Sequence, residues 1–370
     1  MPRAARRVRP QRVHLLVGTR KGAFRLTSTL DRRRWTLLGP HLKGAEVNEI
    51  MLDLRGEPTL YAAATSYWFG TTVQRSTDWG ETWMASEGGV RFADASGPSV
   101  ERVWTVAAPP NEPANVLYAG VDPAALFRSV DGGMTWKEVD ALRGHSTRPK
   151  WNPGAGGLMV HAIRFHPRDR KRMCVAISAA GVFVTEDGGA TWQPRNTGVL
   201  ADFMTEQFPE VGQCVHALET HPHKPDTFYQ QNHCGMYRSS DAGKTWEDIS
   251  EGLPSRFGFV IQTHPRDHRI AFVIPEQGPE FRSAVDGDFA VWKTEDSGRT
   301  WRPNRRGLPA KPAYLHVLRQ AFRGDGLDSL GLYVGTSSGS LYASRDEGKT
   351  WHTIAEHLPE IMSVQTAVES

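Results

Sequence analysis

Three histidines and one glutamate recur at matching places along this chain of 370 residues: His161, His216, His316 and Glu49. Each stands in a short apolar segment that reads as a strand. Imidazole and carboxylate groups are common ligands of zinc, iron and copper, and such an ion acts as a Lewis acid or activates water or dioxygen. These residue types therefore predict a divalent transition-metal site, with Glu49 as a ligand or general base.

The four positions match because the chain is built from repeats. An octet of the form Ser/Thr-x-Asp-x-Gly-x-Thr-Trp occurs six times, at 76–83, 129–136, 185–192, 239–246, 294–301 and 344–351. With Trp35 added from a degenerate copy, the closing tryptophans are 48, 53, 56, 54, 55 and 50 residues apart. Six equivalent copies cannot share one catalytic site, so the octet is interpreted as a folding device.

The residues of the octet are those of a tight hairpin between two strands. The Asp carboxylate can accept hydrogen bonds from backbone N–H groups two or three residues further on, and the Gly adopts a positive φ at little cost. The Trp then begins the next strand and packs its ring between layers. The octet therefore predicts one strand-to-strand turn in each repeat.

Each repeat contains four strand-like segments, which residues 159–195 illustrate. Seven such repeats predict an all-β fold, a single seven-bladed β-propeller of four-stranded antiparallel blades over residues 13–370. The first repeat lacks its first strand, and residues 360–368 have the matching pattern. We expect this C-terminal strand to complete blade one and close the ring. Residues 1–12 carry five Arg and no acid, and are interpreted as a basic, disordered tail.

The octet resembles the Asp-box, or BNR repeat, of the sialidase-like β-propeller superfamily. This superfamily also includes xyloglucan-cleaving glycosidases, sortilin-type receptors and a photosystem assembly factor. The resemblance covers nearly every residue from Val13 to Val368 and implies the propeller fold. It implies a glycosyl hydrolase-like protein without assigning an activity, because one fold serves many functions.

Functional residues usually stand on loops held by a rigid frame, here the loops at one mouth of the central channel. The sequence predicts three catalytic residues there: Glu49, His233 and Arg282. The candidates for binding a small-molecule or carbohydrate substrate are Tyr67, Trp68, Trp104, Trp151 and Arg148. Cys214, His216, His233 and Cys234 lie on adjoining segments of one blade and are expected to cluster near this mouth.

Three alternatives compete with a metal enzyme. An inner-strand histidine can simply bond to the backbone of a neighbouring blade. A metal-free glycoside hydrolase, in particular one like the exo-sialidases, would use paired carboxylates or a tyrosine nucleophile. A non-catalytic scaffold would bind a protein over the mouth, and a broad apolar surface without a deep polar pocket would favour it.

Composition limits the partners. The formal net charge is +3, from 44 basic and 41 acidic residues, so neither nucleic acid nor a membrane is expected as a partner. Phosphate-binding and dinucleotide-binding glycine motifs are absent from the sequence, and no nucleotide cofactor is indicated. Three cysteines, an odd number at low density, suit the reducing cytoplasm. The oligomeric state stays open.

Overall fold

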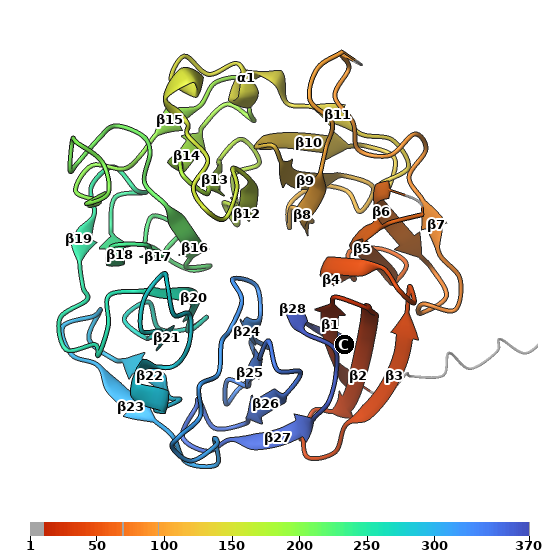
Figure 1. Cartoon of the computed structure of the whole chain (residues 1–370). Helices are drawn as coiled ribbons and strands as arrows, with labels where there is room; N and C mark the ends of the chain where they lie inside the picture. The colour runs from red at the N-terminus through yellow and green to blue at the C-terminus, as the bar shows by residue number, and fades with distance from the viewer. Residues whose placement is uncertain (1–10, 69, 95, 370) are drawn as a thin grey trace, which may run out of the picture.

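The computed structural model describes residues 11–68, 70–94 and 96–369. Seven four-stranded antiparallel sheets stand around a common axis as the blades of a propeller (Figure 1). This confirms the predicted fold class. Most of the predicted basic tail, residues 1–10, lies outside the described part, and the first strand begins at Arg12.

Each blade is built outward from the axis, starting with its innermost strand. Blade one contains β28 (Ile361–Glu369), β1 (Arg12–Thr19), β2 (Gly22–Thr29) and β3 (Thr36–His41). Blade two contains β4 (Glu46–Asp53), β5 (Thr59–Ser66), β6 (Gly70–Ser76) and β7 (Met84–Ala85). Blade three contains β8 (Arg102–Ala107), β9 (Leu117–Asp122), β10 (Ala125–Ser129) and β11 (Lys137–Glu138). Blade four contains β12 (Val160–Phe165), β13 (Met173–Ile177), β14 (Gly181–Thr185) and β15 (Gln193–Pro194).

The remaining blades follow the same plan. Blade five contains β16 (Val215–Thr220), β17 (Phe228–Asn232), β18 (Gly235–Ser239) and β19 (Glu247–Asp248). Blade six contains β20 (Gly258–Thr263), β21 (Ala271–Pro275), β22 (Val291–Thr294) and β23 (Arg302–Asn304). Blade seven contains β24 (Phe322–Gly324), β25 (Leu332–Gly335), β26 (Leu341–Ser344) and β27 (His352–Ala355). Short helices α1 (Asp140–Arg143), η1 (Arg148–Lys150) and η2 (Val285–Gly287) lie in connections. None of the described helices has the length and apolar character needed to span a bilayer.

The C-terminal strand closes the ring, as predicted. β28 pairs with β1 in antiparallel register, from Arg12 opposite Glu369 to Thr19 opposite Ile361. Ile361 and Val364 of β28 are fully buried and belong to the apolar core shared with blades six and seven. The two ends of the chain therefore hold each other within one sheet, and β28 covers the edge of β1 that would otherwise be unpaired.

A bulge in the innermost strands joins neighbouring blades. The ladder between the first two strands skips Asn48 in blade two, His161 in blade four and His216 in blade five. A bulged residue is aimed out of the regular alternation. Here its side chain reaches the next blade: Asn48 Nδ2 donates to the carbonyl oxygen of Val103 at 2.9 Å, and the two histidines do the equivalent. The bulge is a device for sealing the seams between blades.

The octets form the predicted hairpins. In blade two, Asp78 Oδ1 accepts the N–H of Thr82 at 2.9 Å, and Ser76 Oγ accepts the N–H of Gly80 at 2.8 Å. The Asp therefore reaches a residue four positions further on, one beyond the predicted range, and in blade three Asp131 Oδ1 also accepts the N–H of Met134, three positions on, at 3.0 Å. In blades five and six the Trp also joins blades: Trp246 Nε1 donates to the carbonyl oxygen of Arg195 in the preceding blade at 2.8 Å, and Trp301 Nε1 donates to that of Ile249.

The central axis is crossed by side chains of the segment that leads into β24. Gln320 Nε2 donates to the carbonyl oxygens of Trp104 and His161, at 3.1 and 3.4 Å, in blades three and four. Arg323 Nη1 donates to Glu219 Oε1 of blade five at 2.6 Å. Blade seven thus contacts blades on the far side of the ring.

Candidate functional site

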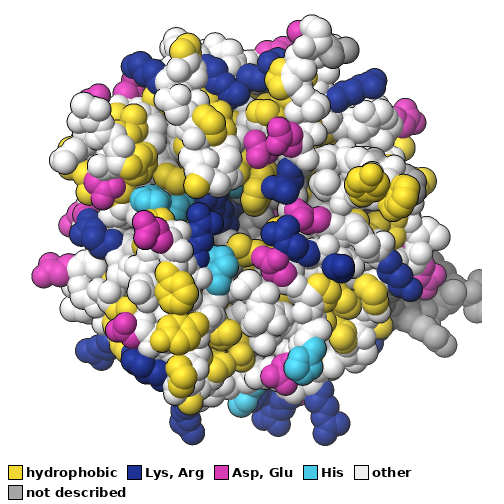
Figure 2. All heavy atoms as spheres, in the orientation of Figure 1, with side chains coloured by type: hydrophobic (Ala, Val, Ile, Leu, Met, Phe, Trp, Pro, Cys, Tyr) yellow, Lys and Arg dark blue, Asp and Glu magenta, His cyan; other side chains and the backbone are white. Residues whose placement is uncertain are grey.

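A cavity of about 580 Å³ opens on the loop-rich face, which is the face expected to carry the site. Its walls come from connections of blades four to seven, and they include Cys214, His216, His233, Phe259, Arg282 and Arg319. Figure 2 shows histidine and basic side chains gathered around the hollow near the middle of this face. Phe203 and Phe257 add aromatic surface, and Glu280 is the carboxylate among the described residues that line the cavity.

The predicted quartet of metal ligands does not assemble. His161 and Glu49 are both buried in seams between blades. His161 Nε2 donates to the carbonyl oxygen of Val215 at 3.0 Å, and burial lowers the pKa of this imidazole well below its usual value. Glu49 Oε2 accepts the N–H of Val106 at 2.8 Å, and burial raises the pKa of its carboxyl. The expected alternative, a bond to the neighbouring blade, accounts for both residues.

Two details of the predicted alignment explain this failure. The residue skipped by the ladder of blade two is Asn48, so the alignment is shifted by one residue at Glu49. His316 is held by a different partner, since its Nδ1 lies 2.8 Å from Glu276 Oε2. Glu276 Oε1 also accepts the N–H of Val317 at 3.0 Å. His316 therefore serves to tie blade seven to blade six.

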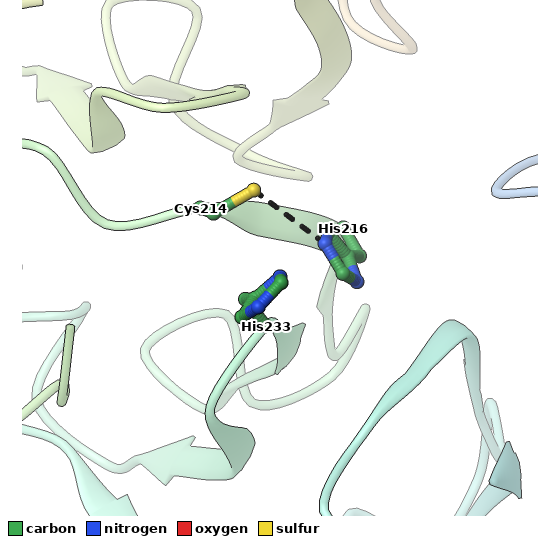
Figure 3. A group of neighbouring side chains, drawn as sticks. All are labelled: Cys214, His216 and His233. Carbon is green, nitrogen blue, oxygen red and sulfur yellow. Dashed lines mark hydrogen bonds between the residues drawn. The ribbon is translucent and has the colours of Figure 1, made fainter. Parts of the chain in front are cut away.

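The structure instead brings Cys214, His216 and His233 together, all within blade five (Figure 3). Their potential ligand atoms lie within 4.8 Å of one another. Cys214 Sγ is 3.5 Å from His216 Nε2, and the rings of His216 and His233 are 5.7 Å apart at 80°. Three of the four residues expected to cluster here do so. The fourth, Cys234, turns away and donates from Sγ to Asp202 Oδ1 at 3.1 Å.

Local structure of blade five places the three side chains. Cys214 directly precedes β16 and His216 occupies its bulge, while His233 begins the turn between β17 and β18. The turn is tied to the start of the inner strand, because the N–H of His233 donates to the carbonyl oxygen of Cys214 at 2.9 Å. Burial lowers the pKa of both imidazoles, more strongly for His216. Both rings therefore bind a proton less readily than a free imidazole.

Two arginines share the ring of Phe259. The guanidinium carbons of Arg282 and Arg319 lie 5.4 and 5.6 Å from its centroid. Neither arginine forms an ion pair within the described part of the chain; Arg282 Nε donates to the carbonyl oxygen of Pro279, and Arg319 Nη1 contacts Met159 Sδ. His216 stacks on the same Phe259 ring at 4.6 Å and 18°. The cavity thus presents, next to the Cys and His group, two cations that form no ion pair with a described residue.

Two of the three predicted catalytic residues lie in the cavity wall. His233 and Arg282 line the cavity, whereas Glu49 is in a seam. None of the five predicted substrate-binding residues lines it. Trp151 is buried and donates from Nε1 to Thr147 Oγ1, and Arg148 stacks on Trp151 and donates to the carbonyl oxygen of Ala124.

The other three predicted substrate-binding residues, Tyr67, Trp68 and Trp104, also lie outside the cavity lining. Trp104 is the bulged residue of β8 and packs under Arg102 in blade three. Tyr67 and Trp68, which are 94% and 81% exposed, form an edge-to-face pair on the turn after β5 of blade two. Aromatic residue type alone predicted their role, and it does not report which loops face one another.

Sequence reasoning missed the aromatic wall of Phe203, Phe257 and Phe259. Nothing in their spacing distinguishes them from core residues. Cys214 and His216 did carry a signal, because residues two apart along a strand share one face. That signal predicts a loose cluster and does not by itself assign a ligand role to Cys214.

Several known proteins are similar to this chain. Residues 234–368 match the family Sortilin-Vps10, described as sortilin, neurotensin receptor 3. A xyloglucanase of Paenibacillus sp is 24% identical over 237 residues, which cover 54% of this chain and 21% of that protein. The chain therefore spans about a fifth of the length of this curated relative.

Solved structures resemble it in fold. The crystal structure of a GH74 enzyme from Niastella koreensis has a TM-score of 0.62 at 18% identity, covering 91% of this chain and 51% of that one. The structure of YCF48 bound to D1 peptide has a TM-score of 0.53 at 14% identity, covering 82% and 81%. These matches relate the chain to propellers of glycosyl hydrolase and Vps10 type. The sialidase relationship stays a prediction.

Proposed function

We propose that the protein is an enzyme that binds an anionic, carbohydrate-derived substrate in the cavity of blades four to seven. The observation that carries this proposal is the pair Arg282 and Arg319, which stack on Phe259 without an ion-pair partner in the described residues. Guanidinium groups bind carboxylate and phosphate through paired hydrogen bonds. The similarity to a xyloglucanase supports a carbohydrate as the remainder of the ligand.

The other cavity residues suit this substrate. Phe203 and Phe257 offer flat apolar surfaces against which the C–H face of a sugar ring can pack. Glu280 also lines this space, and its carboxyl group can transfer a proton to or from the substrate. We also propose that this enzyme depends on a metal ion, held by residues of blade five instead of the predicted quartet. The unpaired thiols of Cys174, Cys214 and Cys234 support the proposal of a reducing, cytoplasmic setting.

A metal-free glycoside hydrolase is the second candidate, and the relatives favour it. Ordinary glycoside hydrolysis uses two carboxylates about 5 to 9.5 Å apart. The described lining of this cavity offers Glu280 alone. Such an enzyme, whether sialidase-like or xyloglucan-cleaving, would therefore need a second acid from outside the cavity.

A binding scaffold is the third candidate, and one feature favours it. Tyr67 and Trp68 form a highly exposed aromatic pair on blade two, away from the cavity. Aromatic side chains of this kind are frequent at protein interfaces. A propeller of similar fold is known bound to a peptide.

Calorimetric titration with sugars of matched size separates these candidates. We expect a uronic acid oligosaccharide to bind at least 10-fold more tightly than its neutral counterpart. Arg282→Gln and Arg319→Gln should each weaken this binding 10- to 100-fold, since a charged hydrogen bond contributes about 1.5–3 kcal/mol. Arg148→Gln is the matched control, because Arg148 also stacks on an aromatic ring but lies outside the cavity. Equal binding of a neutral xyloglucan oligosaccharide, unchanged in the Arg variants, would refute the proposal.

A further inference from the structure

We propose that Cys214, His216 and His233 bind one Zn²⁺ ion in the wall of the cavity, with its fourth position open to the cavity. The binding of the ion rests on these three residues alone. Its role in catalysis rests on the proposed function, because the open position faces the space assigned to the substrate.

The spacing of the side chains already fits the ion. Zn–S and Zn–N bonds of about 2.3 and 2.0–2.1 Å at a tetrahedral angle place sulfur and nitrogen about 3.6 Å apart. Cys214 Sγ and His216 Nε2 are 3.5 Å apart in the structure. All ligand atoms of the group, those of His233 included, lie within 4.8 Å of one another. Two of the three ligands are therefore at bonding separation, and a shift of the His233 ring completes the set.

The protonation state of His216 is fixed in the form that binds metal. Its Nδ1 is 2.6 Å from the carbonyl oxygen of Gly258, which only accepts hydrogen bonds, so Nδ1 carries the proton. The lone pair of Nε2 is then directed at Cys214. A carbonyl group that binds the far nitrogen in this way is the usual second partner of a metal-ligating histidine. The bulge that seals the seam thereby also orients the ligand.

The donor set selects the metal. One thiolate and two neutral imidazoles suit Zn²⁺ or copper and exclude Mg²⁺ and Ca²⁺, which require oxygen ligands. Three protein ligands and one open position are typical of catalytic zinc sites, whereas structural sites use four. In the described residues no fourth Cys, His or carboxylate joins the group. The open position adjoins Phe259, on which both His216 and the two arginines pack.

Binding releases one proton. The Cys214 thiol loses its proton to solvent as the Zn–S bond forms, while each histidine supplies a lone pair from a neutral ring. The open position would then hold water, whose pKa a bound zinc ion lowers. An anion held by Arg282 and Arg319 would lie beside this water, which is the arrangement required for metal-assisted hydrolysis.

The test is calorimetric titration of ZnCl₂ into the full chain, produced without a histidine tag and treated with chelator. We expect one ion per chain with submicromolar affinity, and release of about one proton when buffers of different ionisation enthalpy are compared. Cys214→Ser and His233→Gln should weaken zinc binding at least 100-fold. Both leave the bond from His216 to Gly258 in place, so these variants should keep the fold.

His161→Ala is the matched control. It loses the same kind of seam bond in blade four, and it should bind zinc like the wild type. Stoichiometry near zero, or equal affinity in the wild type and Cys214→Ser, would overturn the proposal. Uronic acid binding that is unchanged in the Arg variants, together with intact zinc binding, would refute the proposed function and leave the zinc site standing, so the two failures are distinguishable.

Discussion

His161 and His216 occupy the same bulge in neighbouring blades, yet of the two only His216 lies in the candidate zinc cluster. Each histidine donates a hydrogen bond from one ring nitrogen to a carbonyl oxygen of the next blade. The surroundings of the other nitrogen differ. In blade five, Cys214 stands two residues before His216, and His233 begins the turn between β17 and β18. The residues at the same places in blade four are Met159 and Ser178.

The correspondence is set by the backbone. The N–H of Ser178 donates to the carbonyl oxygen of Met159 at 3.0 Å, just as that of His233 donates to the carbonyl oxygen of Cys214 at 2.9 Å. Two substitutions at equivalent places therefore separate a structural histidine from a candidate ligand. In a repeat protein, the shared residues report the architecture, and the departures from the repeat report the site.

The largest expected effect concerns the seams that both histidines serve. If seams hold the ring, removal of residues 361–370 should be severely destabilising, because it takes away β28 with Ile361 and Val364. Burial of these two side chains alone contributes about 3–6 kcal/mol. We expect the truncated chain to lose its cooperative melting transition, or to melt more than about 10 °C lower, in circular dichroism. Melting unchanged from the full chain would show that the ring does not depend on this closure.

The next effect sharpens the contrast between the two histidines. A ligand that binds only the folded state raises stability by about 2.7 kcal/mol at a concentration 100 times its Kd. With zinc added, the wild type and His161→Ala should both melt at higher temperature, and His216→Ala should not. A zinc-dependent shift of equal size in both variants would remove the distinction between blades four and five.

The smallest effect tests what the two histidines share. Burial lowers the pKa of both imidazoles in the folded protein, so the unfolded chain binds more protons as pH falls below about 6.5. This contribution to stability is fully present above the pKa of the unfolded chain and is lost progressively as pH falls below about 6.5. His161→Gln should flatten this loss by on the order of 1 kcal/mol in urea unfolding of the metal-free protein. A slope identical to that of the wild type would contradict a buried, neutral His161.

The sequence repeat allows the fold to be predicted from the sequence. Octet spacing predicts seven blades, and the missing first strand of blade one points to the C-terminal segment that pairs with it. Three histidines that precede proline stand at strand ends, and their Nδ1 atoms accept backbone N–H groups of the turns that follow. His166 Nδ1, for example, accepts the N–H of Asp169 at 2.9 Å. The hairpins and turns depend on residues close in sequence, and the closure of the ring follows from counting the strands of each repeat, which is why pattern alone predicts them.

The sequence predicts the site only in part, because the site depends on which loops lie next to one another in the fold. A bulge shifts the alternation of side chains by one residue, so alignment by apolar pattern selects Glu49 where Asn48 takes the bulge. Arg282 is predicted, but its pairing with Arg319 across Phe259 joins the β21–β22 loop to the segment before β24. Residue type alone favours Trp151 and Tyr67, and blade geometry places one in the core and the other on the surface.

The most direct test of the zinc site is an anomalous difference map from crystals of the untagged protein grown with one equivalent of Zn²⁺, recorded at the zinc edge. We expect one dominant peak, about 2.3 Å from Cys214 Sγ and about 2.0–2.1 Å from a nitrogen of each of His216 and His233, with its free side toward Arg282 and Arg319. A peak at His161 or His316, or no peak in the wall of this cavity, would contradict the proposed site.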